Sequence, residues 1–338
     1  MDAANLTPGG VAISRHFDDP EAVKEAVRGA NVEFVPLSRG RYEADLTMVL
    51  LNGFRLQRST MPPNRARGIA EPSTVTLLVS LGPRAAPLVN GMALGDGQLA
   101  VLRAGQEFDG IARDGLAWSS LTLDETVAED LAERWQLPTT LARASAVLAT
   151  DRLAMDRLRR AMAAITDLGD ELPVVVGNPA VCAALGDALM DNLGSLRFGD
   201  ASAPARRVTR DVTRIVAAAE DFLAASGSRP IYLGELCRAL GVSERKLHGA
   251  FAIACGVSPH AYLKYRRLLM VRRVLRAGGG SAGLVKSAAL AHGFWHLGNF
   301  ARDYRAYFGE GPSETLRAGQ GTRLRPYDDP VDALALPA

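Results

Sequence analysis

The sequence predicts an α+β protein in which an antiparallel β-barrel or sandwich, with accompanying helices, precedes an all-α domain. Short apolar runs separated by glycine, proline and asparagine fill residues 32–113, whereas apolar residues recur at helical spacing from residue 124 onwards. The charge changes as well: residues 205–320 contain 18 Lys and Arg against 8 Asp and Glu, and the rest of the chain is acidic. A basic helical domain of this kind indicates that one part of the protein meets a polyanion.

The composition is typical of a globular protein. Of 338 residues, 48% are hydrophobic and 22% are charged, and no run of about 18 apolar residues is present to cross a membrane. The N-terminus has an early acidic residue and no basic-then-apolar segment, so we expect no secretory signal. Three widely spaced cysteines, Cys182, Cys237 and Cys255, fit small buried side chains better than disulfides or a metal site. We therefore expect a cytoplasmic protein without a membrane segment.

Six segments of the N-terminal region have the length and pattern of strands. They are VEFVPL, ADLTMVLL, FRLQRS, TVTLLVSL, QLAVLRA and FDGIA, with turn-forming residues between them. Asn52-Gly53 stands between two of these runs and predicts a two-residue hairpin, because Asn-Gly tolerates positive φ at both central positions. Many short strands at this spacing are typical of an antiparallel sandwich or small barrel.

Three helices are predicted next, over residues 124–135, 142–168 and 179–196. The first opens with acidic residues and carries apolar residues on one face. A turn and a small, proline-containing stretch then interrupt the pattern, which indicates a linker. The predicted organisation is a β domain at 1–123, a helical connector at 124–196, a linker at 197–206, a C-terminal domain at 207–318 and a loosely ordered tail at 319–338.

Residues 233–251, LGELCRALGVSERKLHGAF, have the pattern of a helix-turn-helix unit. Leucines recur at helical spacing, and Gly241 supplies the left-handed residue that ends the first helix. Ser243 is a natural N-cap for the second helix. The exposed side of that helix then carries donors suited to phosphates and base edges, namely Arg245, Lys246 and His248.

A second unit of the same form follows about fifty residues later. Its first helix is predicted to end at Gly293, and the next helix to run over residues 295–308 with Phe300, Tyr304 and Phe308 inward. The outward residues of that helix are His296, Asn299, Arg302 and Arg305.

A helix of about 19 residues that begins at Pro259 is predicted between the two units. At 1.5 Å per residue it spans about 28 Å, close to the roughly 34 Å of one DNA turn. Two recognition helices separated in this way suit successive major grooves on one face of a duplex.

Residues 233–317 resemble the DNA-binding domain of the AraC-type transcription regulators. The resemblance is carried by ALGVSERKLHGAF, GVSPHAYLKYRRL and AHGFWHLGNFARDYRAYFGEGPSETL, in that order. The GFWHLG form is similar to the subgroup that includes the ethanolamine-operon regulator.

The resemblance implies a regulator that binds double-stranded DNA. Base contacts are implied at Arg245, His248, Gly249, Leu297, Gly298, Asn299 and Arg302, and the predicted DNA-binding set also includes Ser243, Lys246, His296 and Arg305. Gly249, Leu297 and Gly298 depart from the family pattern, which reduces the base reading expected at those positions. Direct reading is therefore expected to be stronger in one major groove than in the other.

The resemblance also implies a cupin-like sensor and dimerisation module at the N-terminus. Its partners are an unknown small-molecule effector and a second copy of the chain, and RNA polymerase is a further possible partner. The candidate effector-binding residues are Arg39, Arg55, Arg67, Glu107 and Trp118, each of which singly also fits an ordinary surface or strand-end residue. Metal-binding cupins need closely spaced histidines, and His16 is the only histidine of the N-terminal part. We therefore expect no metal, no cofactor and no enzymatic activity.

Two alternatives from other classes stay open. A cupin-type enzyme is disfavoured because residues 1–140 supply no metal cluster or acid–base pair. A protein-binding module with a vestigial DNA-binding domain is compatible with glycine at two base-reading positions. The GGSAG segment around Ser281 matches a nucleophile elbow, but it lacks the preceding buried strand, so Ser281 is interpreted as a loop or capping residue.

Overall fold

The computed structural model describes residues 9–51, 53–82, 86–136, 145–198, 210–227, 229–278 and 283–321. These residues form two compact units. The first contains the described residues 9–34 and 43–198, and the second contains residues 35–42 and 210–321.

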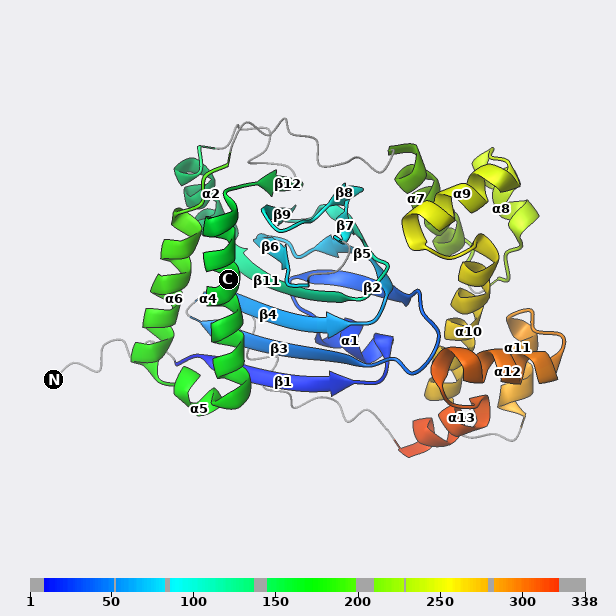
Figure 1. Ribbon diagram of the computed structural model, residues 1–338. Helices are drawn as coiled ribbons and strands as arrows, with labels where there is room; N and C mark the ends of the chain where they lie inside the picture. Colours follow the sequence, from blue (N-terminus) through cyan, green and yellow to red (C-terminus); the bar gives the residue numbers. More distant parts are fainter. Residues whose placement is uncertain are drawn as a thin grey trace. The chain divides into compact units, whose positions relative to one another are not determined.

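The strands of the first unit form two sheets (Figure 1). A seven-stranded sheet has the order β1-β3-β4-β11-β6-β9-β12, and a five-stranded sheet has the order β2-β5-β10-β7-β8. The strands are β1 Val11–Phe17, β2 Ala30–Pro36, β3 Ala44–Leu51, β4 Phe54–Met61, β5 Asn64–Ala70, β6 Thr74–Ser80, β7 Leu88–Val89, β8 Met92–Ala93, β9 Gln98–Arg103, β10 Glu107–Ala112, β11 Leu116–Asp124 and β12 Ala146–Ala149. In the described part of the chain the sheets are separate and their registered pairs are antiparallel, so the architecture is a sandwich rather than a closed barrel.

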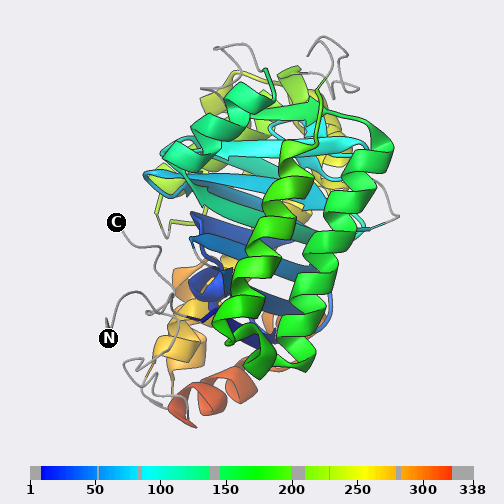
Figure 2. The ribbon, with the colours of Figure 1, turned by 90° about the vertical axis from the view of Figure 1, so that its left-hand side faces the viewer.

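Helices cover one face of the seven-stranded sheet. The helices of this unit are α1 Pro20–Ala26, α2 Glu125–Arg134, α4 Arg152–Glu171, α5 Pro173–Val176 and α6 Pro179–Gly194. Figure 2 shows α4 and α6 side by side across the sheet. The largest apolar core lies between these helices and the strands, with Leu56, Leu77 and Leu121 among its fully buried members. The helices are thereby held by the burial of apolar side chains from both layers.

The opposite face of the same strands has a different character. Because successive side chains of a strand point to opposite faces, the neighbours of the core residues face the five-stranded sheet. Among these neighbours Gln57, Thr76, Ser120 and Thr122 are buried, although they are polar. The seven-stranded sheet therefore has an apolar face toward the helices and a partly polar face toward the second sheet.

All six predicted strands are present, and the predicted hairpin is confirmed. Leu51 pairs with Phe54 across the two-residue turn, and Gly53 has a φ of 84°; Asn52 lies outside the described residues. The sequence pattern missed β1, β5, β7, β8, β11 and β12. Strand β5, for example, has the sequence NRARGIA and buries Arg65, so it contains no apolar run that would reveal it.

The predicted helix over 142–168 is wrong in its first part. Ala146–Ala149 is strand β12, which pairs with β9 and forms the edge of the sheet, and helix α4 begins at Arg152. Asp151 caps α4 by accepting a hydrogen bond from the backbone N–H of Ala154 at 3.0 Å. The alanines of this segment favour a helix locally, but the free edge of β9 offers pairing that overrides this preference.

The second unit is helical, as predicted. Its helices are α7 Arg210–Ala225, α8 Leu233–Leu240, α9 Glu244–Cys255, α10 Pro259–Ala277, α11 Leu284–Ala291, α12 Leu297–Phe308 and α13 Pro312–Gly321. Aromatic rings pack between α10 and α12: the Tyr265 ring lies 5.0 Å from that of Tyr307 and 5.9 Å from that of Phe308. Such ring pairs stabilise a small helical core beyond the area that they bury.

The ends of the predicted linker and tail are only partly described. Phe198, within the predicted linker 197–206, forms a β-bridge with Thr150 and packs its ring 5.1 Å from that of Trp135. Residues 199–206 and 322–338 lie outside the described residues, and α13 extends to Gly321, past the predicted start of the tail. No helix in the described part of the chain is long and apolar enough to span a membrane.

Candidate nucleic-acid interface

The first helix-turn-helix unit consists of α8 and α9, and its turn has the predicted geometry. Gly241 ends α8 in the left-handed conformation, with a φ of 63°. The Ser243 hydroxyl then accepts a hydrogen bond from the backbone N–H of Lys246 at 3.2 Å and caps α9. The small Cys237 is buried on α8, and Leu247 is buried on α9. This local chemistry fixes which face of α9 points outward.

The outward face of α9 carries the predicted donors. Arg245 and Lys246 are exposed and His248 is half-buried, with its ring 6.0 Å from the ring of His260 at the start of α10. A Cβ added at Gly249 meets no atom within 4 Å. Space at Gly249 is therefore open.

The second helix-turn-helix unit consists of α11 and α12. Gly293 has a φ of 77° and ends the turn after α11. Helix α12 begins at Leu297, two residues later than predicted, and His296 is its N-cap residue without a side-chain capping bond. Consequently Trp295 precedes the helix, where 68% of it is exposed.

The predicted inward and outward faces of α12 are confirmed. Phe300, Tyr304 and Phe308 are buried, with exposed fractions of at most 5%. The predicted surface residues are exposed: His296, Leu297, Gly298, Asn299, Arg302 and Arg305.

Two arginines of α12 have different surroundings. Arg302 donates from Nη2 to Oδ1 of Asn299 at 3.1 Å, so the two predicted base readers form one polar pair. Arg305 instead forms an ion pair with Glu314 at 3.3 Å. The backbone N–H of Gly311, and after it the Arg305 charge, hold the pKa of Glu314 below its ordinary value. Arg305 is thereby less available to a phosphate than Arg302.

Helix α10 joins the two helix-turn-helix units, and two of its arginines make contacts within the helical domain. Ser258 caps the helix by accepting from the N–H of Ala261 at 3.2 Å. Arg272 pairs with Glu310 at 3.1 Å and lies 4.6 Å from the ring centre of Phe308. Arg267 lies over the Phe294 ring at 5.0 Å, and burial lowers its pKa. These two side chains hold α10 against the second helix-turn-helix unit.

The first unit of the fold contains a cavity of about 100 Å³ between its two sheets. Of the five candidate effector-binding residues, only Trp118 lines it. Arg55 pairs with Glu71 at 3.0 Å, and Arg67 pairs with Glu107 at 3.2 Å. Arg39 belongs to the second unit, where its guanidinium lies 5.2 Å from the Tyr307 ring centre.

Sequence reasoning missed the other residues of the cavity wall. These include Val32, Phe34, Met61, Leu78, Ser80, Phe108 and Ser120. One sequence signal could have located the cavity wall. Hydroxyl and apolar side chains are mixed in TVTLLVS and WSS, which is unusual for strands that are covered on both faces. Among the described residues no group of three His, Cys, Asp or Glu side chains is placed to hold a metal, and Ser281 lies outside them.

The geometry of α8–α9 and α11–α12 defines a helix-turn-helix domain. Residues 236–318 match the family model described as a helix-turn-helix domain. The match covers the same part of the chain as the resemblance to the AraC-type regulators, whereas the ethanolamine-operon subgroup is a separate, finer assignment.

Named relatives match the chain over part of its length. The probable thc operon regulatory protein of Rhodococcus erythropolis is 34% identical over 141 residues, which are 41% of this chain and 42% of that protein. The XylDLEGF operon transcriptional activator of Pseudomonas putida is 36% identical over 96 residues, 28% of this chain and 30% of that protein. The matches thus span less than half the length of these relatives.

Solved structures give weak overlays. The AraC-like transcriptional activator CuxR covers 83% of this chain and 99% of its own with 16% identity and a TM-score of 0.39. ToxT from Vibrio cholerae covers 93% of this chain and 99% of its own with 9% identity and a TM-score of 0.31. At these scores neither overlay defines the fold of this chain.

Proposed function

We propose that the protein is a sequence-specific DNA-binding transcription regulator controlled by a small-molecule effector in its N-terminal domain. The observation that carries the proposal is the pair of helix-turn-helix units, each with a left-handed glycine and a second helix that exposes polar side chains. The excess of basic residues in this half of the chain supplies the sequence-independent attraction to phosphate.

The two recognition helices, α9 and α12, enter successive major grooves in this proposal. Helix α10 has 19 residues and so spans about 28 Å, which suits the separation of two grooves on one face of the duplex. On α9 the base readers are Arg245 and His248, with Lys246 on phosphate. On α12 they are Asn299 and Arg302, while Arg305 is drawn toward Glu314.

The two grooves are read unequally. Gly249 and Gly298 have no side chain to offer a base, and the space around each is open. Ser243 is committed to capping α9, and its remaining capacity suits a backbone phosphate. His296 and Leu297 lie at the start of α12, where they contact the groove wall.

The proposal includes three partners and a place of action. The regulator acts in the cytoplasm as a homodimer, binds double-stranded DNA and contacts RNA polymerase when it activates transcription. The GFWHLG motif supports a subgroup similar to the ethanolamine-operon regulator. Effector binding shifts the population of DNA-binding-competent states, because a ligand stabilises the state that it binds more tightly.

A titration of the full-length protein against labelled DNA from its own upstream region tests the proposal. We expect binding that survives an excess of unrelated competitor DNA and weakens steeply as salt rises, because phosphate contacts release counterions. A fragment pool from the whole genome covers an operator that lies elsewhere. Absent binding throughout that pool, or binding that is insensitive to salt, contradicts the proposal and favours a protein-binding module.

A further inference from the structure

We propose that the cavity between the two sheets binds an uncharged, largely apolar small molecule of about one aromatic ring. This inference rests on the proposed effector control and names the chemical class of the effector. It excludes carboxylates and amines as the effector.

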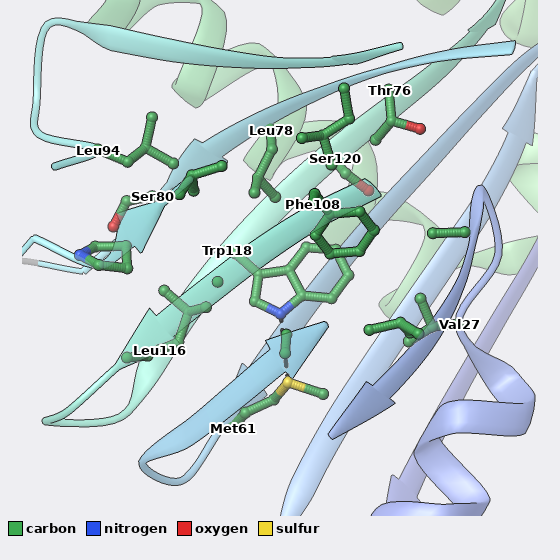
Figure 3. A pocket seen from close by; sticks show the side chains of 18 of the residues that line it. Val27, Met61, Thr76, Leu78, Ser80, Leu94, Phe108, Leu116, Trp118 and Ser120 are labelled. Atoms are coloured by element: carbon green, nitrogen blue, oxygen red, sulfur yellow. Dashed lines mark hydrogen bonds between the residues drawn. The ribbon is translucent and has the colours of Figure 1, made fainter. Parts of the chain in front are cut away.

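The walls of the cavity come from both sheets. Figure 3 shows the Trp118 indole at the centre with the Phe108 ring beside it, and Leu78 and Leu94 along another side. The indole N–H donates to the sulfur of Met61 at 3.5 Å, which fixes the plane of the ring. Two aromatic rings and several aliphatic side chains thus offer a flat, apolar ligand a ready contact surface.

The size of the cavity limits the ligand. Its volume is about 100 Å³, and an apolar protein cavity of roughly 150 Å³ accepts benzene. This cavity is smaller than that, so a single ring with a short substituent enters only when the lining side chains move outward. A fused-ring compound or a long chain requires the sheets to separate.

Charge on the ligand is disfavoured by the lining. Arg28 is its only residue of a charged type in the described part of the chain, and its polar groups have partners. Its backbone N–H donates to Gln57 Oε1 at 3.0 Å, and its C=O accepts from Gln57 Nε2 at 2.8 Å. Its guanidinium donates to the backbone carbonyls of Glu25 and Val27. An ammonium on the ligand meets no acidic side chain in this lining. A carboxylate reaches a counter-charge only by drawing the Arg28 guanidinium away from the carbonyls of Glu25 and Val27, so burial of either charge is unfavourable.

Hydroxyl groups give the cavity one polar side. Ser80, Ser120 and Thr76 line it from β6 and β11, and Figure 3 shows Ser80 close to Leu94. The Thr76 hydroxyl is already bonded to that of Thr122 at 3.1 Å, and Ser120 accepts from Gln57 at 3.5 Å. Ser80 is therefore the residue that we assign to a hydroxyl or carbonyl of the ligand.

The same strands show that this wall is not ordinary sandwich packing. The residues that alternate with Thr76, Leu78 and Ser80 are Val75, Leu77 and Val79, and all three lie in the apolar core under the helices. The face of β6 that carries Val75, Leu77 and Val79 is thus apolar, whereas the opposite face carries three hydroxyls, of which those of Thr76 and Ser80 line the cavity. Buried hydroxyls weaken a core unless they are bonded, which is consistent with a ligand that uses one of them.

The probes that test the inference are benzyl alcohol, benzoate and benzylamine, which share one ring and differ in charge. Each is titrated into the full-length protein by calorimetry, and the fluorescence of the protein is recorded in parallel. We expect benzyl alcohol to bind at least tenfold more tightly than either charged probe. Equal or tighter binding of benzoate or benzylamine, or no binding of benzyl alcohol, overturns the inference.

Two variants locate the site. Leu78→Phe fills the cavity, so it should weaken benzyl alcohol binding at least tenfold, whereas Trp118→Phe should abolish the fluorescence response and keep the calorimetric one. Trp135 and Trp295 lie elsewhere, since Trp135 donates to the carbonyl of Leu193 at 2.8 Å and Trp295 is in the second unit. Ser14→Ala is the control, because Ser14 lies on β1, outside the cavity lining. If Leu78→Phe fails to fold, 1-naphthylmethanol replaces it, and binding of this larger probe as tight as that of benzyl alcohol overturns the size assignment.

The DNA titration separates failure of this inference from failure of the proposed function. Benzyl alcohol that binds with the expected selectivity, while operator affinity stays unchanged, upholds the ligand class and contradicts effector control. Operator binding that persists while no neutral probe binds overturns the ligand class and leaves the DNA-binding function in place.

Discussion

The guanidinium of Arg302 donates a hydrogen bond to the side-chain oxygen of Asn299, one turn earlier on α12, at 3.1 Å. Both side chains are exposed, and they project from the face of α12 opposite its buried aromatic residues. The pair holds an arginine fork in a fixed direction before DNA arrives, which lowers the conformational entropy lost on binding. In the proposed complex with DNA, Asn299 and Arg302 would therefore act as one recognition element.

Arg302→Ala should weaken operator binding about tenfold or more, because a bidentate contact to a base contributes roughly 1–3 kcal/mol. Asn299→Ala should weaken it less, and the double variant should lose less than the sum, since the two residues share one interaction. Fluorescence anisotropy with labelled operator measures all three. Arg317→Ala removes the same charge from an exposed position of α13 and should have a small effect; an Arg302→Ala variant with wild-type affinity contradicts the assigned role.

Alanine substitutions at Gly249 and Gly241 should change the free energy of unfolding in opposite directions. Gly249 lies inside α9 with open space around it, so Gly249→Ala should raise the free energy of unfolding by up to about 1 kcal/mol. Gly241 has a φ of 63°, and Gly241→Ala should lower the same quantity by about 1 kcal/mol because alanine is strained there. Urea unfolding monitored by circular dichroism gives both values. Stabilisation by Gly241→Ala is incompatible with the turn described.

Loss of the cap on α9 should destabilise the first helix-turn-helix unit. Ser243→Ala removes the acceptor for the N–H of Lys246, which typically costs about 1 kcal/mol. Ser287→Ala is the matched control, since Ser287 lies within α11 and its hydroxyl bonds only locally, to the carbonyl of Leu284. Thermal unfolding should show a lower Tm for Ser243→Ala alone. Equal Tm values for both variants count against the cap.

Stability should fall at high pH because of Tyr304. Burial raises the pKa of this phenol to about 12, above the ordinary value of 10. Between these two values the folded state keeps a proton that the unfolded state has lost, so the free energy of unfolding decreases as pH rises through this window. Its hydroxyl donates to Thr315 at 2.9 Å, and Tyr304→Phe removes both that bond and the titrating group.

Unfolding in urea from pH 9 to pH 11.5 checks this. The variant should be less stable than the wild type at pH 9, and the difference should narrow as pH rises. Parallel curves for the two proteins over the whole window indicate that Tyr304 does not cause the pH dependence.

Much of the helical unit could be predicted because its information is local. The left-handed turn at Gly241, the cap at Ser243 and the inward spacing of Phe300 and Tyr304 all depend on residues within about one helical turn of each other. The strands of the first compact unit were harder to predict from the sequence. Strand β12 contains residues that favour a helix, and only the edge of β9, some fifty residues earlier, makes it a strand.

The sequence by itself determined the two-part organisation, the helix-turn-helix repeat and the residues on the outer faces of α9 and α12, because periodicity and capping act along one segment. Only the tertiary structure decided that Arg305 pairs with Glu314 and that Trp118 is the one candidate effector residue on the cavity wall. It also decided that Arg55 and Arg67 pair with acidic side chains instead. Those relationships depend on which strands and helices become neighbours, and long-range packing sets them rather than any local preference.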